Sequence, residues 1–254
     1  MTEGGIRLQS EGKKQPKLSI ITVVYNAVSL IPGFMENVLA YRSANVELVM
    51  LDGGSTDGTL ELLQQYSNKI DYWRSEPDEG IYDAMNKAVE YTRGQWVYFM
   101  GADDRLLGGF NKVVNALRNS HVVYYAKVVL WGDIRGKAYK KYDFIKMEIC
   151  HQSIFYPKKV FDYYQYETHY KILADQHFNI RCFADKRFKW QFLDDLVAIY
   201  DTRGFSANKV DTLYYQHYNH MVKKYLGLWV YTRYRFRKYK LMRKQNKQNG
   251  KGSL

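Results

Sequence analysis

The stretch 95-QWVYFMGADD-104 decides the fold. After its first residue, five aromatic, β-branched or apolar residues follow without a polar break, which is typical of a strand buried on both faces of a parallel sheet. The strand ends at Gly101, and Asp103 and Asp104 come next, at the edge where open α/β sheets bind ligands. Two adjacent carboxylates repel each other, so a fold usually keeps them together only on its surface or around a cation. The pair therefore indicates either an acidic turn or helix cap, or oxygen ligands for Mg²⁺ or Mn²⁺.

The residues before this stretch alternate between strand-like and helix-like patterns. We expect strands over 18–26, 47–52, 70–75 and 95–100, and helices over 28–42, 60–66 and 81–94. This alternation predicts βαβ units and an α/β fold with a mainly parallel sheet. Right-handed crossovers place the ends of the four strands on one rim. The polar residues Tyr25, Asp52, Asp78 and Asp103 should therefore converge there on a site.

From about residue 121 the pattern changes. Residues 121–133 and 189–201 resemble longer, antiparallel strands, and 171–183 between them predicts a helix. With 254 residues and 46% hydrophobic content, the chain can bury a sizeable core. We find no internal repeat.

The terminal composition and the cysteines suggest a cytoplasmic protein. Residues 1–16 are polar and predict a mobile leader, with no apolar segment typical of a signal peptide. The sequence contains no run of 18 apolar residues, the length that a membrane-spanning helix needs. Cys150 and Cys182 lack a CxxC spacing, so we interpret them as reduced thiols in the core.

The chemistry at the rim favours a nucleotide. The turn 53-GGSTDG-58 matches neither GxGxxG nor GxxxxGK[ST], which excludes a dehydrogenase or P-loop interpretation. A strand-end Asp can accept from a uracil imide or ribose hydroxyls, and Tyr25 can stack on a base. A metal at Asp103 can take a diphosphate. Together these features predict a nucleoside-diphosphate site and not a nucleic-acid groove.

Four motifs in this order and spacing resemble the N-terminal half of a family 2 glycosyltransferase with the GT-A fold: SIITVVYN, ELVMLDGGSTDGT, SEPDEGIYDAMNKA and GQWVYFMGADD. The resemblance is strong over 17–110 and continues more loosely, through HQSIFY and ADQHF, to about 205. It implies an inverting enzyme of the bacterial surface-polysaccharide type. Such an enzyme moves a sugar from a nucleotide diphosphate, usually a UDP-sugar, to an acceptor hydroxyl with Mn²⁺ or Mg²⁺.

The resemblance also implies a domain plan and a set of ligand contacts. The glycosyltransferase domain would span 17–211, with a nucleotide-sugar half over 17–110 and an acceptor half over 111–211. The implied donor contacts are Val23 and Tyr25 beside the base, Asp52 on the uracil or ribose, and Asp78 and Asn86 around the nucleotide and sugar. Asp103 would be the metal-linked acid of the family's DxD motif. Because Gly101 replaces the first acid, Asp103 and Asp104 would share the metal.

Three residues of the second half complete the predicted site. The family's general base opens a helix three positions before an aromatic residue, and Asp175 before Phe178 matches this, although a surface helix Asp would look the same. It would remove the proton of the acceptor hydroxyl. His151 is either a structural residue or a contact to substrate or diphosphate. Arg203, beside a glycine, could close over the diphosphate.

The C-terminal segment 212–254 predicts a basic amphipathic helix. Eleven of the twelve net positive charges lie after Asp211, where no acidic residue occurs. An aromatic and apolar stripe at helical spacing comprises Tyr225, Leu228, Trp229, Thr232, Phe236 and Tyr239. We interpret 221–254 as a helix on an anionic membrane surface, which places the protein on the inner face of the cell membrane beside a lipid-linked or polysaccharide acceptor. Removing 221–254 should then abolish vesicle binding.

Three alternatives remain open. The stripe could instead pack on the protein's own core. Because the rest of the chain is almost neutral, nucleic acid is not the expected partner of the tail. Gly101 and the basic tail also suit a nucleotide- or nucleic-acid-binding module without catalysis. A nucleotidyltransferase would also use paired acids with a metal, but its Gly-rich, basic loop after the first strand is missing.

Overall fold

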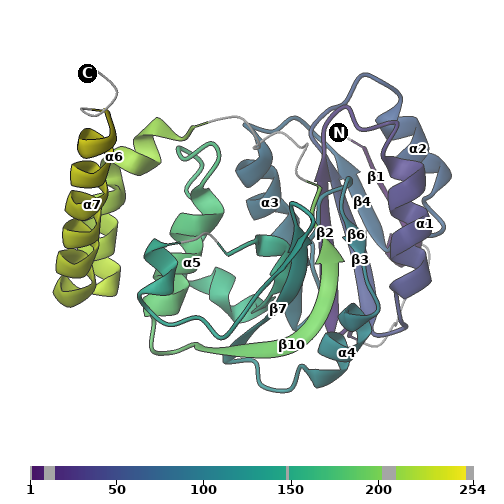
Figure 1. Cartoon of the computed structure of the whole chain (residues 1–254). Helices are drawn as coiled ribbons and strands as arrows, with labels where there is room; N and C mark the ends of the chain where they lie inside the picture. Colours follow the sequence, from purple (N-terminus) through teal and green to yellow (C-terminus); the bar gives the residue numbers. More distant parts are fainter. Residues whose placement is uncertain (1, 9–14, 147–148, 202–209, 250–254) are drawn as a thin grey trace.

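A computed structural model describes residues 2–8, 15–146, 149–201 and 210–249 (Figure 1). Its strands are β1 (Thr2–Gly4), β2 (Leu18–Val24), β3 (Val46–Asp52), β4 (Tyr72–Ser75), β5 (Trp96–Phe99), β6 (Arg105–Leu106), β7 (Val122–Leu130), β8 (Asp133–Arg135), β9 (Ile154–Pro157) and β10 (Lys189–Ile199). Its α-helices are α1 (Ile31–Tyr41), α2 (Thr59–Gln65), α3 (Ile81–Glu90), α4 (Gly109–Ala116), α5 (Ala174–Ala184), α6 (Thr212–Met221) and α7 (Leu228–Asn249). Short helical turns are η1 (Ile6–Leu8), η2 (Asp143–Ile145), η3 (His151–Ser153), η4 (Lys158–Asp162) and the π-turn η5 (Val222–Leu226).

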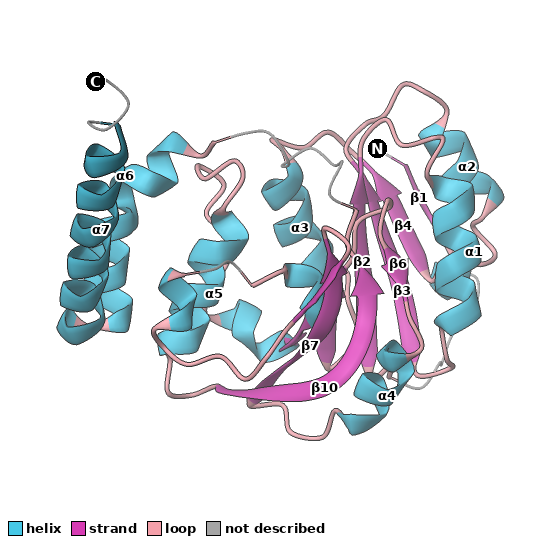
Figure 2. Cartoon of the chain, in the orientation of Figure 1, coloured by secondary structure: helices cyan, strands magenta, loops and turns pink. Residues whose placement is uncertain are grey.

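The expected parallel sheet forms the centre of the molecule. Within the described ranges, the strands follow the order β1-β4-β3-β2-β5-β9-β7-β10-β6, with β8 beside β7. The four strands predicted in the first half, β2 to β5, pair in parallel. Helices α1 and α2 cover one face of this sheet and α3 covers the other, which confirms the α/β prediction (Figure 2).

Alternation along the strands divides the apolar residues between two cores. On β3, Leu48 and Met50 pack with α1, whereas Val49 and Leu51 pack with α3. Helix α3 begins after Gly80, whose φ of 120° suits glycine alone. Its buried residues, Tyr82, Ala84, Met85, Ala88 and Val89, form one helical face. This packing fixes the carboxyl ends of the strands beside the start of α3.

The long strands of the second half differ from the prediction. β7 and β10 run parallel to each other, with Val122 opposite Lys189 and Val129 opposite Ile199. Only their shorter neighbours β9, β8 and β6 are antiparallel. The chain between β7 and β10 contains α5 and returns to the same end of the sheet, as a crossover connection requires. The sequence of β10 resembles an antiparallel strand because much of the strand is partly exposed, as one face of an antiparallel sheet commonly is.

The beginning of the chain is not a free leader where the structure describes it. Strand β1 pairs antiparallel with β4, matching Glu3 with Arg74. The Glu3 carboxylate accepts a hydrogen bond of 2.5 Å from the hydroxyl of Tyr72, and Arg7 donates to the carbonyl of Tyr91. These contacts correct the prediction for residues 2–8, because β4 would otherwise present an unpaired edge.

The C-terminal helices are joined to the body before they extend from it. Met221, Val222, Leu226 and Val230 are buried in the core shared with α5 and the sheet. Helices α6 and α7 lie beside α5, on the side away from the sheet (Figure 1). The globular body therefore extends past residue 211, the predicted end of the glycosyltransferase domain. Among the described helices, none is long and apolar enough to cross a membrane.

Candidate active site

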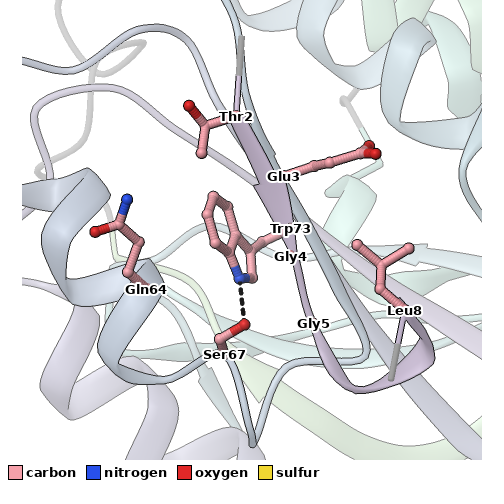
Figure 3. Close-up of a pocket in the computed structure, with 8 residues that line it drawn as sticks. All are labelled: Thr2, Glu3, Gly4, Gly5, Leu8, Gln64, Ser67 and Trp73. Carbon is pink, nitrogen blue, oxygen red and sulfur yellow. Dashed lines mark hydrogen bonds between the residues drawn. The ribbon is translucent and has the colours of Figure 1, made fainter. Parts of the chain in front are cut away.

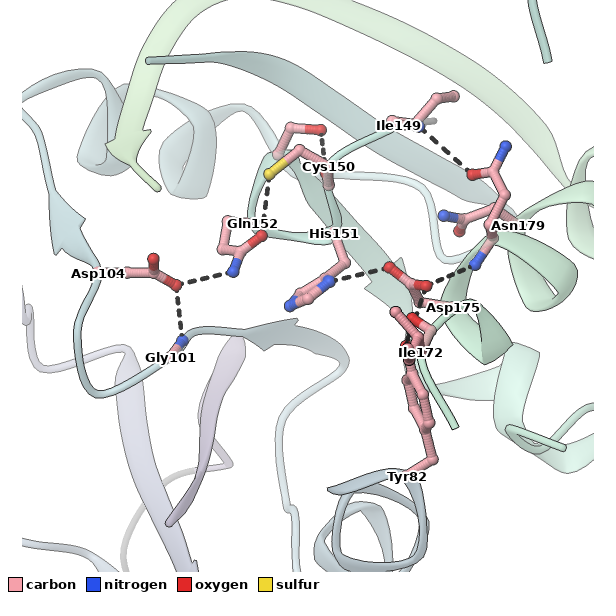
Figure 4. Close-up of polar contacts among 12 residues, drawn as sticks. Tyr82, Gly101, Asp104, Ile149, Cys150, His151, Gln152, Ile172, Asp175 and Asn179 are labelled. Atoms are coloured by element: carbon pink, nitrogen blue, oxygen red, sulfur yellow. Dashed lines mark hydrogen bonds and ion pairs between the residues drawn. The ribbon is translucent and has the colours of Figure 1, made fainter. Parts of the chain in front are cut away.

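A cleft of about 660 Å³ opens at the carboxyl end of β5. Residues from both halves of the chain line it, among them Asp103 after β5, His151 on η3 and Asp175 at the start of α5. The tertiary structure thus brings to one cleft three side chains that the sequence analysis selected separately, and Figure 4 shows two of them, His151 and Asp175, in contact.

Asp175 is held by donors from three elements. Its Oδ1 accepts from the backbone N–H of Gln176 at 2.8 Å and from the hydroxyl of Tyr82 on α3 at 3.1 Å. Its Oδ2 lies 3.0 Å from Nδ1 of His151. The Tyr82 hydroxyl also lies 2.5 Å from the carbonyl of Ile172. Only 15% of the Asp175 side chain is exposed, so its carboxylate is fixed in one orientation.

His151 is half-buried beside this carboxylate. Burial opposes its charged form, but the hydrogen bond and the charge of Asp175, together with the charges of Asp104 and Asp103, outweigh burial and raise the pKa of His151 above its ordinary value. Its Nε2 makes no hydrogen bond to a described residue. In Figure 4 this nitrogen points away from Asp175, toward the side of the cleft where Gly101 lies.

Asp104 faces the protein interior. Its Oδ2 accepts from the N–H of Gly101 and from the side chain of Gln152, both at 2.8 Å, and its Oδ1 accepts from the N–H of Asp201 at 3.0 Å. The residue is 2% exposed. Burial, and then the charge of Asp103, raise the pKa of Asp104 to about 6. Asp104 therefore ties the loop after β5 to η3 and to the end of β10.

Asp103 is the acid of this pair that lines the cleft. Its carboxylate folds back over Gly101, where a Cβ would come within 2.5 Å of Oδ1. The glycine that replaces the first motif acid therefore leaves room for the Asp103 carboxylate. Figure 4 shows the hydrogen bond that joins Asp104 to the backbone of Gly101.

The donor set of the cleft is small for a metal ion. Within the described ranges, no three His, Cys, Asp or Glu side chains gather closely enough to hold an ion by themselves. Mg²⁺ and similar hard ions are commonly bound by one or two carboxylates together with substrate phosphates. A single cleft-facing carboxylate at Asp103 fits that arrangement, and the buried Asp104 does not add a second ligand.

A second group of predicted residues meets beside the cleft, at the ends of β2 to β4. The Asp78 carboxylate packs directly against Gly53, where a Cβ would collide with it, and Tyr25 lies 3.5 Å from the same Cβ position. Tyr25 is 65% exposed. An exposed aromatic ring thus lies beside a partly exposed carboxylate, as a nucleoside contact requires.

Two residues that were predicted to contact the sugar donor, Asp52 and Asn86, make their hydrogen bonds to the protein itself. Asp52 is 1% exposed, and its carboxylate accepts from Ser55 and from the hydroxyl of Ser75 at 2.6 Å. The Asn86 amide makes two hydrogen bonds of 2.9 Å to the backbone of Tyr166. Neither side chain presents these polar atoms to the cleft. Val23 is half-buried against the core on the α3 face, and the predicted lid residue Arg203 lies outside the described residues.

The structure adds two residues that the sequence analysis missed. Tyr82 lies in a recognised motif, but only the fold shows that it reaches Asp175. Gln152 links Asp104 to η3, and its Oε1 accepts from the thiol of Cys150. In the sequence, Tyr82 lies in the same motif as Asn86, and Gln152 follows His151. This nearness to selected residues is the only feature of the sequence that could have pointed to them.

A second hollow, of about 450 Å³, lies between β1 and α2 (Figure 3). The indole N–H of Trp73 donates to Ser67 there at 2.9 Å. Among the described lining residues, Glu3 is the only charged one. This hollow holds no group of catalytic residues comparable to that of the cleft.

Comparison with known proteins gives a family match over most of the chain. The family model described as Glycosyl transferase family 2 matches residues 19–213. A relative from Mycobacterium bovis, named PGL/p-HBAD biosynthesis glycosyltransferase, is 31% identical over 206 residues, covering 77% of this chain and 80% of the relative.

Solved structures show the same fold at low identity. TarS residues 1–349 from S. aureus, in complex with UDP-GlcNAc, has a TM-score of 0.61 at 18% identity, covering 81% of this chain and 65% of that one. The mannosyltransferase PcManGT from Pyrobaculum calidifontis, in complex with GDP-Man and Mn²⁺, has a TM-score of 0.57 at 16% identity, covering 84% of this chain and 62% of that one. The chain thus spans less than two thirds of either structure.

Proposed function

The chain belongs to glycosyltransferase family 2, and from this we propose that it transfers a sugar from a nucleotide diphosphate, most simply a UDP-sugar, to an acceptor hydroxyl with inversion. The observation that supports the proposal is the shared cleft, which Asp103, His151 and Asp175 line together. An acid at a strand end and a proton acceptor on the facing wall are what a single displacement needs.

The first-half wall would bind the donor. Tyr25 is placed to stack on the base and Asp78 to contact the nucleoside, while Asp52 supports the turn beneath them. Asp103 would hold Mn²⁺ or Mg²⁺ together with the diphosphate, and the protein's own part is to fix that carboxylate over Gly101. When bound, the ion offsets negative charge on the leaving diphosphate.

The second-half wall would activate the acceptor. The acceptor hydroxyl enters on the side of His151 and Asp175, and its proton passes to this pair as the oxygen attacks the anomeric carbon. The attack comes from the face opposite the diphosphate, so the configuration inverts. Support comes from the carboxylate of Asp175, which three donors hold at the cleft wall.

The experiment is metal-dependent nucleotide release from a panel of UDP-, GDP- and dTDP-sugars. Wild-type protein should hydrolyse one donor slowly with Mn²⁺ or Mg²⁺. Asp103→Ala and Asp175→Asn should each reduce this rate by roughly 100-fold or more. Asp162→Asn, at an exposed carboxylate outside the cleft, is the matched control and should keep it.

Other outcomes would favour the rival functions. Tight donor binding without turnover, in the presence of a range of glycan and lipid acceptors, would favour a non-catalytic module. Diphosphate release from a nucleoside triphosphate would favour a nucleotidyltransferase.

We propose further that α7 docks on an anionic membrane surface, next to a lipid-linked or polysaccharide acceptor on the cytoplasmic face. Helix α7 has two opposed apolar faces. Val230 is 3% exposed and Tyr234 is half-buried against the body. At about 100° per residue, the predicted stripe lies on the other side. Its exposed members are Leu228, Trp229, Thr232, Phe236 and Tyr239.

The charges around the stripe favour this occupant. Arg233, Lys240 and Arg243 lie beside it, with Arg233 over the ring of Trp229 and Lys240 over that of Phe236. Each Lys or Arg near an anionic surface adds on the order of 1 kcal/mol to binding. The stripe, apart from half-buried Tyr225, does not pack on the protein's own core.

Point substitutions test this better than removal of 221–254, which would also remove buried core residues. Trp229→Ser with Phe236→Ser should abolish sedimentation with phosphatidylglycerol-containing vesicles and leave the unfolding transition unchanged. Tyr163→Ser, at a similarly exposed aromatic residue elsewhere, is the control. Undiminished vesicle binding by the double variant would overturn the proposal, as would binding to nucleic acid alone.

A further inference from the structure

We propose that His151, held by Asp175, is the group that receives the proton of the acceptor hydroxyl. The inference rests on the proposed transfer reaction and changes the assignment of its base from Asp175 alone to a His–Asp pair. On this assignment Asp175, although it also lines the cleft, is a positioning residue that acts on the reacting atoms through His151.

The first argument is the occupancy of the Asp175 carboxylate. Gln176 donates to Oδ1, the Tyr82 hydroxyl shares its one hydrogen between Oδ1 and the carbonyl of Ile172, and His151 lies against Oδ2. Both carboxylate oxygens are therefore already engaged by groups of the protein. A carboxylate anchored in this way serves better as a fixed negative charge than as a mobile proton acceptor.

The second argument is the orientation of the imidazole. When Asp175 is ionised and His151 neutral, Nδ1 carries the hydrogen that Asp175 accepts at 3.0 Å. This tautomer leaves the lone pair on Nε2. That nitrogen has no hydrogen-bond partner among the described residues, and it points into the cleft that Asp103 also lines (Figure 4).

The third argument is the support of η3. Gln152, the next residue, donates to Asp104 at 2.8 Å, and its own carbonyl accepts from the hydroxyl of Tyr98 at 2.6 Å. The same short segment is therefore tied to the loop that carries Asp103 and, through His151, to α5. This arrangement fixes the distance between the donor-binding acid and the imidazole.

The step balances without a further reactant. The acceptor oxygen forms a bond to the anomeric carbon, and the bond from that carbon to the diphosphate oxygen breaks with its electron pair on the nucleotide. The hydroxyl proton moves to Nε2 of His151, and Asp175 stabilises the imidazolium. The proton then leaves to solvent after the products dissociate.

The proposal predicts a particular pH dependence of kcat/KM. It is measured for the nucleotide sugar that the protein hydrolyses in the donor panel described above, with water as the acceptor. Activity requires neutral His151, so kcat/KM should rise with pH through a pKa above the ordinary histidine value. Other titratable or charged groups act on His151 or line the same cleft: Tyr82, Asp103, Asp104, Arg135, Tyr139, Cys150, Lys171, Tyr200, Asp211 and Tyr215.

Two variants separate the roles. His151→Gln keeps a donor for Asp175 but cannot take a proton, so kcat/KM should fall by roughly 100-fold or more and the histidine limb should vanish. Asp175→Asn should also lower the rate, but its remaining activity should keep a histidine limb that moves to lower pH. If Asp175 is itself the base, His151→Gln keeps most of the activity, and that result would overturn the proposal.

A measurement on the wild-type protein alone decides the geometry even if a variant does not fold or no donor is found. Nitrogen NMR of the neutral His151 ring should show hydrogen on Nδ1 and none on Nε2. The opposite tautomer overturns the His–Asp pair. Absence of turnover with every donor would instead count against the proposed function, so the two failures are distinguishable.

Discussion

In the first half of the chain, Asp52 and Asn86 direct their hydrogen bonds to the protein itself, whereas in the second half His151 and Asp175 bind each other and line the cleft. Both halves contain residues that stand out in the sequence. The difference teaches that a polar residue at a strand end can be required by the fold instead of by the ligand. Four predictions test this comparison.

The largest effect should come from removing a first-half carboxylate that serves the fold. Asp52→Ala leaves the hydroxyls of Ser55 and Ser75 without their buried acceptor, so we expect the free energy of unfolding to fall by about 2–4 kcal/mol. Urea denaturation measures this. Glu61→Ala, at an exposed position on α2, should change it by less than about 0.5 kcal/mol. Unchanged stability with lost donor binding would restore Asp52 as a ligand contact.

The next largest effect should be a loss of stability at acid pH that arises in the second half of the chain, at His177. Burial, and then the positive charges of Arg181, His169, Lys224 and His217, lower the pKa of His177 to about 4. Between pH 6.5 and 4, His177 is therefore protonated in the unfolded chain but stays neutral in the folded protein. His177 contributes stability above pH 6.5 that is lost as the pH falls to 4, by about 3 kcal/mol.

His177→Leu should flatten the pH dependence of the unfolding free energy across this window. His121→Gln, at an exposed histidine, is the matched control and should leave the slope unchanged. An identical slope in His177→Leu would assign the acid sensitivity to other groups.

A smaller effect should follow at Asn86. Asn86→Ala breaks both hydrogen bonds to the backbone of Tyr166, which should cost about 1–3 kcal/mol of stability. Because the amide does not face the cleft, the KM for the donor should not change in steady-state assays. Asn68→Ala, at an exposed turn, should alter neither quantity. A raised KM at full stability would place Asn86 on the donor after all.

The smallest effect on stability should come from Tyr25, a first-half residue whose side chain is exposed to solvent. Its ring is 65% exposed, so Tyr25→Ala should leave stability within about 0.5 kcal/mol of wild type. Loss of stacking on the base should raise the KM for the donor roughly tenfold, by about 1–2 kcal/mol. Tyr25→Phe keeps the stacking surface and should behave as wild type. Equal KM values for all three proteins would remove Tyr25 from the nucleotide site.

The sequence predicted the first half of the fold well because its signals are local. Buried strands and the helix of residues 81–90 show their periodicity in short windows, and crossover handedness places the strand ends on one rim. The second half was harder. The pairing of β7 with β10 depends on where a long connection returns, and no short window contains that information.

The sequence by itself determined the α/β architecture, the family and the identity of Asp103, His151 and Asp175 as residues of interest. Only the tertiary structure decided that Asp104 faces inward, that Asn86 holds Tyr166, and that His151 meets Asp175. The physical reason is that periodicity shows which face of an element is buried. The direction of a polar side chain depends on donors that lie far away in the sequence.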